Sequence, residues 1–263
     1  MQETISTKQQ LIKEGFSLFI PIYNMGTMAE KNISICWSWL PRIFENFELI
    51  VVDDNSNDGS CGFFMKDPGL INEKKDGIKC LHYKNGPSRR ENLAASFDIA
   101  QNNLAGFIDG DLSCDLDDLI NAMNLIRNKA ADIVIGSRYI KGAIIKQRFF
   151  RRIISFIYNS ALRFFFNSNI CDHQCGLKIF NMRTIMPIIR RMGYDKTYFR
   201  GWFWDAELLI RAQAEGVKII EMPVHWSFSD KSTFNVKKEV FSIIKIVKLW
   251  LELRSKNKLN HKS

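Results

Sequence analysis

The sequence predicts an α/β protein with a mostly parallel, doubly wound central sheet flanked by helices. Short apolar, partly β-branched runs alternate with helical patterns along the first half of the chain. Polar, acid-rich segments follow several of those runs, at the sheet edge where such folds bind ligands. With 263 residues, the chain is long enough for one large domain with a sizeable core.

The strands and helices are expected in alternation, because each apolar run is bounded by turn-forming residues. The predicted strands are Phe16–Ile22, Phe47–Val52, Ile78–Tyr83, Leu104–Ile108 and Asp132–Ile135. The predicted helices are Met28–Phe44, Ser88–Ala100 and Leu116–Ile126. The helix that starts at Ser88 carries a capping-box pattern, with Glu91 three residues later.

Three segments are expected along the chain: a polar N-terminal leader (1–14), an α/β domain (15–234) and a basic amphipathic helix with a tail (235–263). The N-terminus lacks a signal-peptide apolar core, and no run reaches the roughly 18 to 20 apolar residues that span a bilayer. Lys237–Lys258 combines a broad apolar face, cationic flanks and Trp250, and Gln147–Asn167 is similar. The pattern suits a helix in a membrane interface, although a helix packed on the sheet gives the same pattern.

Composition narrows the function. The formal net charge of +9 favours phosphates, nucleic acid or an anionic membrane surface as partners. Six scattered cysteines and four histidines form no zinc pattern, so reduced thiols are expected, with a Cys171–Cys175 pair as the alternative. Neither Gly-x-Gly-x-x-Gly after the first strand nor a P-loop is present, which disfavours a dehydrogenase or a P-loop protein. No nucleic-acid motif is found.

The Asp109-Gly110-Asp111 element is the strongest chemical signal. It follows a predicted buried strand, and its two acids are two residues apart, so an extended chain points both carboxylates to one side. Such a pair can hold Mg²⁺ or Mn²⁺ together with substrate phosphates, although a solvated turn has the same residues. Asp53 or Asp54, after the second strand, can accept hydrogen bonds from a nucleotide base or ribose.

From Phe16 to about Phe234 the sequence resembles a family 2 glycosyltransferase with the Rossmann-like GT-A fold. Phe19–Asn24 resembles the opening strand of that family, Val51–Ser60 its nucleotide-binding loop and Asp109–Asp111 its metal motif. Other segments resemble the branch that transfers sugars to polyprenyl or dolichyl phosphate, such as dolichyl-phosphate β-glucosyltransferase or mannose synthase. These segments are Asp109–Ser113, Ile135–Tyr139, Arg151–Arg152, Asp172–Lys178, Trp204–Glu207 and Glu221–Trp226.

The resemblance implies a UDP- or GDP-hexose donor, a polyprenyl phosphate acceptor and Mg²⁺ or Mn²⁺ at Asp109 and Asp111. Arg138 and Arg152 match positions that hold the acceptor phosphate. The donor pocket implied is Pro21, Tyr23, Asn24, Asp53, Asp54, Ser56, Asp109, Gln174, Lys178 and Lys231. Two departures are Met25, where the family often has an acid, and Asp230–Phe234, where a basic element is usual, so the role of Lys231 stays open.

A lipid phosphate is largely a dianion at pH 7, so it can attack the anomeric carbon of the donor sugar without a general base. Direct displacement by this one acceptor inverts the configuration at that carbon. We expect such an enzyme on the cytoplasmic face of a membrane, without nucleic acid as a partner. In relatives that transfer to hydroxyl groups, a carboxylate near Asp205 or Glu207 serves as base, so a hydroxyl-directed enzyme of polysaccharide or glycan assembly is the alternative. Both acids can instead favour the start of a helix at Phe203. A non-catalytic basic binding protein remains a third possibility.

Overall fold

A computed structural model describes residues 11–62, 73–75, 78–146, 149–196, 200–201, 203–227 and 245–255. Its main sheet has the strand order β3-β4-β2-β1-β5-β8-β6-β9, and β10 pairs with β7 in a small second sheet. The strands are β1 (Phe16–Ile22), β2 (Phe47–Asp53), β3 (Glu73–Lys75), β4 (Ile78–His82), β5 (Leu104–Ile108), β6 (Ile133–Ser137), β7 (Ile144–Lys146), β8 (Leu177–Asn181), β9 (Ile219–Pro223) and β10 (His225–Ser227).

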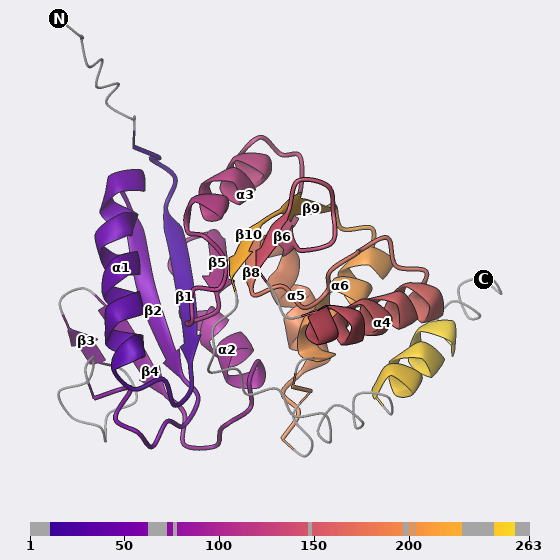
Figure 1. Cartoon of the computed structure of the whole chain (residues 1–263), viewed down its shortest axis with the longest axis horizontal. Coiled ribbons are helices and arrows are strands. Elements are labelled where there is room, and N and C mark those ends of the chain that lie inside the picture. The colour runs from indigo at the N-terminus through magenta and orange to yellow at the C-terminus, as the bar shows by residue number, and fades with distance from the viewer. Residues whose placement is uncertain are drawn as a thin grey trace, which may run out of the picture.

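Helices cover both faces of the sheet (Figure 1). The helices are α1 (Thr27–Ile43), α2 (Glu91–Ser96), α3 (Asp117–Arg127), α4 (Phe149–Phe166), α5 (Met182–Met192) and α6 (Phe203–Ala214), and a 3₁₀ turn, η1 (Phe97–Ile99), follows α2. Helices α1 and α3 pack in one apolar core, and α2, α5 and α6 pack in the other. The predicted α/β class with a mostly parallel sheet is confirmed.

A third layer lies outside α6. Nine of the twelve residues of α6 are buried, because its far side packs against Leu162 of α4 and against Ile246 and Leu249. The latter two belong to a helix at residues 245–255, seen beside α4 in Figure 1. The amphipathic helix expected there is present over these residues, but part of its apolar face is buried by protein. Within the described chain, no helix has both the length and the apolar character needed to cross a bilayer.

Three sequence-based expectations need correction. Strand β8 was missed; it runs antiparallel between β5 and β6. Ile12, assigned to the polar leader, is buried and exchanges backbone hydrogen bonds with Ile43 and Glu45. The Ser88 hydroxyl does accept from a backbone amide of α2, that of Asn92, but Glu91 does not complete a capping box, because its carboxylate pairs with Arg200.

Candidate active site

The segments singled out in the sequence meet at one edge of the main sheet. Strands β1, β2 and β5 are parallel neighbours, so the loops after them lie together. Because β8 runs antiparallel to β5, its start rather than its end lies at this edge. The residues that precede β8 therefore lie beside Asp109, and the Asp109 amide donates to the Gly176 carbonyl at 3.0 Å.

Close backbone packing fixes the Asp109-Gly110-Asp111 turn. A Cβ on Gly110 would lie 2.7 Å from the Pro21 carbonyl, so only glycine lets this turn approach the end of β1. Asn32 of α1 donates to the Gly110 carbonyl at 2.9 Å. A Cβ on Gly176 would lie 2.0 Å from Asp109 Oδ2, so the chain before β8 forms the opposite wall. The Asp109 carboxylate thus lies in a narrow slot.

Arg90, the residue before α2, contacts Asp109 in this slot. Its Nη2 lies 2.9 Å from Asp109 Oδ1, its Nε lies 2.8 Å from Asp205 Oδ2, and its guanidinium lies 4.7 Å from the centre of the Phe107 ring. The Arg90 side chain is 3% exposed, whereas that of Asp109 is 29% exposed. Arg90 therefore joins an acid that reaches solvent to an acid that does not. Sequence reasoning missed it, although a basic residue at a helix start opposes the helix dipole and indicates a tertiary partner.

The two acids of the turn fit a divalent cation. Burial and the nearby charge of Asp109 raise the pKa of Asp111, against the lowering effect of hydrogen bonds from Ser113. A cation between two such carboxylates relieves their repulsion, and oxygen ligands are those that Mg²⁺ and Mn²⁺ prefer. Asp109 and Asp111 are the residues that would hold the ion. Arg90 also contacts Asp109, so an ion held there would share this carboxylate with Arg90.

Asp53 organises the loop after β2. It is fully buried, its Oδ1 accepts from the Ser56 amide at 3.1 Å and from the Ser56 hydroxyl, and its Oδ2 lies 2.6 Å from His82 Nδ1. With Cys61, this group brings three possible metal ligands within 4.8 Å of one another. Both oxygens of Asp53 are already bonded, however. These contacts fix the conformation of the loop after β2.

Asp54 and Asn24 are also engaged by the protein. The Asp54 carboxylate accepts from Ser88, from the Arg89 amide at 2.5 Å and from Asn92 at 2.6 Å. The backbone amide of Asn24 donates to the Ser56 hydroxyl at 3.0 Å, so the loops after β1 and β2 are joined. Two other residues were expected to contact the donor. The Pro21 carbonyl packs closely against Gly110, and Tyr23 is half-buried at the same edge of the sheet.

Arg138, at the end of β6, is held by Asp172. Its Nε and Nη2 donate to the two oxygens of Asp172 at 2.7 and 2.9 Å, and its guanidinium lies 5.5 Å from the centre of the Trp226 ring. Burial acts to lower the pKa of Arg138, but the Asp172 carboxylate outweighs it and raises the pKa. Arg138 is therefore a permanent, fixed cation. The backbone amide of Gln174 donates to Asp172 Oδ1 at 3.2 Å, so the loop before β8 is linked through Asp172 to Arg138.

Arg152 is exposed on α4, one turn before Phe156, whose ring makes an edge contact with the ring of Tyr139, the residue after Arg138. Burial raises the pKa of the Tyr139 hydroxyl, while the charges of Arg138 and Arg152 act to lower it. Both arginines thus lie near one ring.

The Cys114 thiol lies 3.6 Å from Cys175 Sγ. This hydrogen bond and burial raise the pKa of Cys114. The charge of Asp109 acts in the same direction, and the charge of Arg138 acts to lower the pKa.

Lys178 and Asp205 do not lie where the sequence suggested. Both are fully buried, with 3.0 Å between Lys178 Nζ and Asp205 Oδ1, and Lys178 also donates to the Cys175 carbonyl at 2.6 Å. The cations Arg90 and Lys178 outweigh burial and lower the pKa of Asp205. Neither a donor contact for Lys178 nor a base role for Asp205 fits this arrangement.

Lys231 lies outside the described residues. All six cysteines are free thiols, and Cys175 faces Cys114 rather than Cys171.

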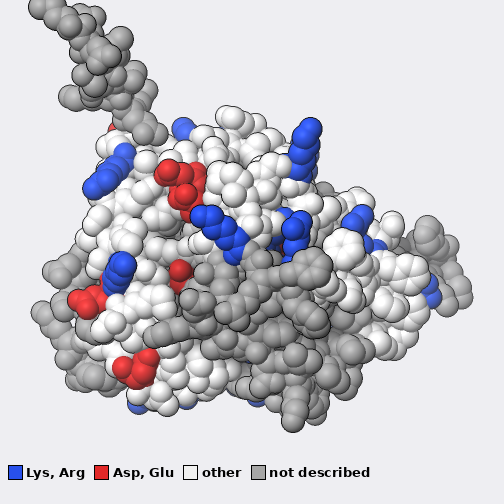
Figure 2. All heavy atoms as spheres, viewed as in Figure 1, with Lys and Arg blue, Asp and Glu red and all other residues white. Residues whose placement is uncertain are grey.

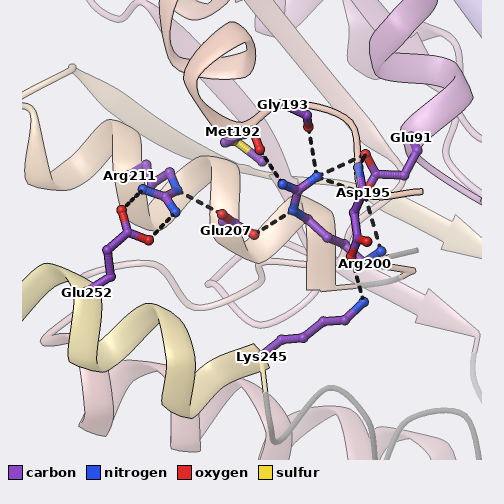
Figure 3. Close-up of polar contacts among 9 residues, drawn as sticks. All are labelled: Glu91, Met192, Gly193, Asp195, Arg200, Glu207, Arg211, Lys245 and Glu252. Carbon is purple, nitrogen blue, oxygen red and sulfur yellow. Dashed lines mark hydrogen bonds and ion pairs between the residues drawn. The ribbon is translucent and has the colours of Figure 1, made fainter. Parts of the chain in front are cut away.

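A chain of ion pairs connects α2 to the C-terminal helix (Figure 3). Arg200 contacts Glu91 at 2.9 Å and Glu207 at 2.8 Å, and Arg211 contacts Glu207 and Glu252, each at 2.8 Å. Both oxygens of Glu207 are therefore bonded to arginines, which argues against a base role. The same contacts anchor the helix at 245–255 on α6.

Comparison with known proteins identifies the fold and the family. The model for glycosyl transferase family 2 matches residues 17–188. Glycosyltransferase AglD of Haloferax volcanii is 27% identical over 242 residues, which cover 90% of this chain but only 37% of that protein. Dolichyl-phosphate beta-glucosyltransferase of Saccharomyces cerevisiae is 25% identical over 233 residues, 82% of this chain and 68% of that protein.

Solved structures agree. Glucosyl-3-phosphoglycerate synthase from Mycobacterium tuberculosis, solved with Mn²⁺, UDP and glucosyl-3-phosphoglycerate, superposes with a TM-score of 0.59 at 13% identity and covers 91% of this chain and 80% of its own. TarS of S. aureus, solved with UDP, gives a TM-score of 0.55 at 16% identity over 92% of this chain and 65% of its own. These likenesses show a shared GT-A fold. The chain therefore belongs to glycosyl transferase family 2.

Proposed function

We propose that this glycosyltransferase moves a hexose from a UDP- or GDP-sugar to a polyprenyl phosphate on the cytoplasmic face of a membrane. The observation that carries the proposal is that Arg138, which follows β6, lies at the same edge of the sheet as the Asp109–Asp111 pair, which follows β5. Arg152 lies one turn before Phe156 on α4, and the Phe156 ring contacts the ring of Tyr139, the residue after Arg138. Relatives named for transfer to lipid phosphates support it, among them the yeast enzyme and a dodecaprenyl-phosphate galacturonate synthase, 25% identical over 200 residues, 71% of this chain.

The proposed roles follow from charge and exposure. Mg²⁺ or Mn²⁺ at Asp109 and Asp111 would stabilise negative charge on the leaving diphosphate when bound. Tyr23, Asn24 and the loop that Asp53, Asp54 and Ser56 shape would line the nucleotide pocket, with Gln174 nearby. Arg152 would bind the acceptor phosphate, because its guanidinium is exposed and a guanidinium fork matches phosphate oxygens. Arg138, fixed by Asp172, would add positive charge where two anions must approach each other.

Transfer to a hydroxyl group is less well supported by the geometry. It needs a carboxylate base that can reach the acceptor. Asp205 is buried between two cations, and Glu207 is bonded to Arg200 and Arg211. A phosphate acceptor needs no such base, which fits the absence of a free carboxylate at these two positions.

The test is an assay of the full chain with Mn²⁺ or Mg²⁺, a panel of UDP- and GDP-hexoses and polyprenyl phosphate. A phosphate-linked sugar in the organic phase, abolished by EDTA and by Asp111→Asn, is expected. Asp117→Asn is the matched control, since Asp117 is an exposed acid of α3. Absence of a phosphate-linked lipid product with every donor would refute the proposal.

A further inference from the structure

We infer that the outer surface of α4, with the adjoining side of the helix at 245–255, docks on an anionic lipid bilayer. This surface, called the α4 face below, consists of Ile153, Ile154, Phe156, Ile157, Phe164, Phe165, Val247 and Leu251. The inference rests on the proposed function, because it names where a membrane carrying the acceptor would meet the protein.

The α4 face gathers most of the exposed apolar bulk of the described chain. Ten large hydrophobic residues are exposed among the residues that the structure describes, and eight of them belong to this surface. Phe164 is 83% exposed, Ile157 is 61% exposed and Phe156 is 57% exposed. Single exposed apolar residues are ordinary, but eight of them gathered on two neighbouring helices are typical of a docking surface.

Helix geometry makes the exposed residues one stripe. Residues 153, 157 and 164 are four and seven apart, so they follow one line along α4. The opposite side is the one that packs on the protein, where Leu162 is fully buried with Phe203 and Ile246. The helix therefore has a buried apolar side and an exposed apolar side. Among the described residues, the second one contacts the rest of the protein through Phe156, whose ring meets that of Tyr139.

Charge favours lipid as the occupant. Helix α4 contains arginines and neither Asp nor Glu, and both Arg152 and Arg163 are exposed. On the neighbouring helix Lys248 and Arg254 are exposed, while the acid Glu252 is bonded to Arg211 (Figure 3). In Figure 2 the part of the surface over α4 that is visible beside the grey atoms is mostly uncharged, and basic rather than acidic atoms lie near it. An apolar stripe with cationic borders suits the interface of an anionic bilayer.

The α4 face leads to the candidate acceptor site. The Phe156 ring makes an edge contact with the Tyr139 ring, with 6.5 Å between their centres, and Tyr139 follows Arg138 in the chain. Arg152 lies one turn before Phe156 on the same helix. Trp250, at 4.0 Å from the Arg254 guanidinium, adds an aromatic and cationic border of the kind found in membrane interfaces. A lipid whose chain stays in the bilayer would thus present its phosphate beside Arg138 and Arg152.

Vesicle flotation of the full chain tests the inference. We expect the wild type to float with vesicles of phosphatidylcholine and phosphatidylglycerol, and less with phosphatidylcholine alone. Ile157→Ser/Phe164→Ser should lower partitioning at least about tenfold, because two large side chains no longer enter the bilayer. The matched control is Ile35→Ser/Ile144→Ser, which removes two exposed isoleucines from other surfaces and should leave partitioning unchanged. Arg163→Gln should lower it about fivefold in anionic vesicles only.

Two further readouts separate the possible failures. Circular dichroism melts confirm that both double variants fold, since all four positions are exposed. With a donor, the α4 variant should lose transfer to polyprenyl phosphate in vesicles but keep transfer to a short, water-soluble polyprenyl phosphate. Flotation that depends on the α4 face without transfer to either acceptor would reject the proposed function and keep the docking surface.

Three results overturn the inference. The wild type does not float with the vesicles, or Ile157→Ser/Phe164→Ser floats as well as the control Ile35→Ser/Ile144→Ser. The third result is a wild-type dimer, seen by light scattering, that the α4 substitutions dissociate. The last result would mean that the α4 face joins two copies of the chain.

Discussion

Arg90 holds Asp109 at the candidate metal site, with 2.9 Å between Nη2 and Oδ1, while its Nε binds the fully buried Asp205. Arg90→Gln removes one of the two cations that pair with Asp205, and breaking a buried ion pair costs about 3–5 kcal/mol. We therefore expect a loss of that size in the free energy of unfolding in urea. Arg190→Gln, which breaks an exposed pair with Asp98, should cost at most about 1 kcal/mol. Equal losses would contradict the buried role of Arg90.

Asp205→Asn separates a positioning role from a base role. Because the carboxylate lies between Arg90 and Lys178, we expect the amide to lower stability while kcat, measured where the variant is folded, falls less than about tenfold. Loss of a general base instead costs about 10²–10⁴ in rate. Steady-state kinetics beside urea unfolding decide the matter. Unchanged stability with kcat reduced a thousandfold would restore Asp205 as the base.

Gly176→Ala tests the slot around Asp109. The added methyl group would lie 2.0 Å from Asp109 Oδ2 and 3.0 Å from its Cβ, so the short side chain must turn away from the site. We expect Mn²⁺ affinity, measured by calorimetry, to fall at least about tenfold, within the range for displaced metal ligands and their supports. Gly62→Ala is the control, because its Cβ would meet no atom closer than 3.3 Å. Wild-type affinity in Gly176→Ala would show that Asp109 is not held there as an ion ligand.

The buried His173 should make the free energy of unfolding depend on pH. Burial lowers the pKa of His173 to about 4, from an ordinary value near 6.5, so the unfolded chain takes up a proton more readily than the folded protein. The stability from this residue is complete above about pH 6.5 and falls as the pH drops towards 4, by about 3 kcal/mol in all. Urea unfolding at several pH values should show this slope, and His173→Gln should reduce it. Identical pH profiles for the two proteins would contradict the assignment.

Local patterns predicted what depends on neighbours in the chain. β1 and β5 have the expected bounds because their apolar runs are short and end at turn residues. β8 was missed, because it begins just after a polar segment and gains its place by antiparallel pairing with distant strands. Its Lys178 has the composition of a surface residue, and only the fold shows that it is buried against Asp205.

The candidate site follows the same rule. Asp109 and Asp111 were found from their spacing, and their edge position followed from the alternation of strands and helices. Arg90 was not found, because its partners are 19 and 115 residues away in the chain. Glu91 seemed to belong to a capping box, but its partner is Arg200, 109 residues further on. Long-range ion pairs leave no local pattern in one sequence.

The nature of the acceptor distinguishes a lipid-phosphate transferase from a hydroxyl-directed one, and a comparison of two acceptors tests it. Initial rates are measured with a polyprenyl phosphate and with the free polyprenol of the same length, under the same donor, Mn²⁺ and detergent. Transfer to the phosphate should be at least about a hundredfold faster, since the dianion needs no base and meets the cations Arg138 and Arg152. Equal or faster transfer to the polyprenol would contradict the proposed phosphate acceptor.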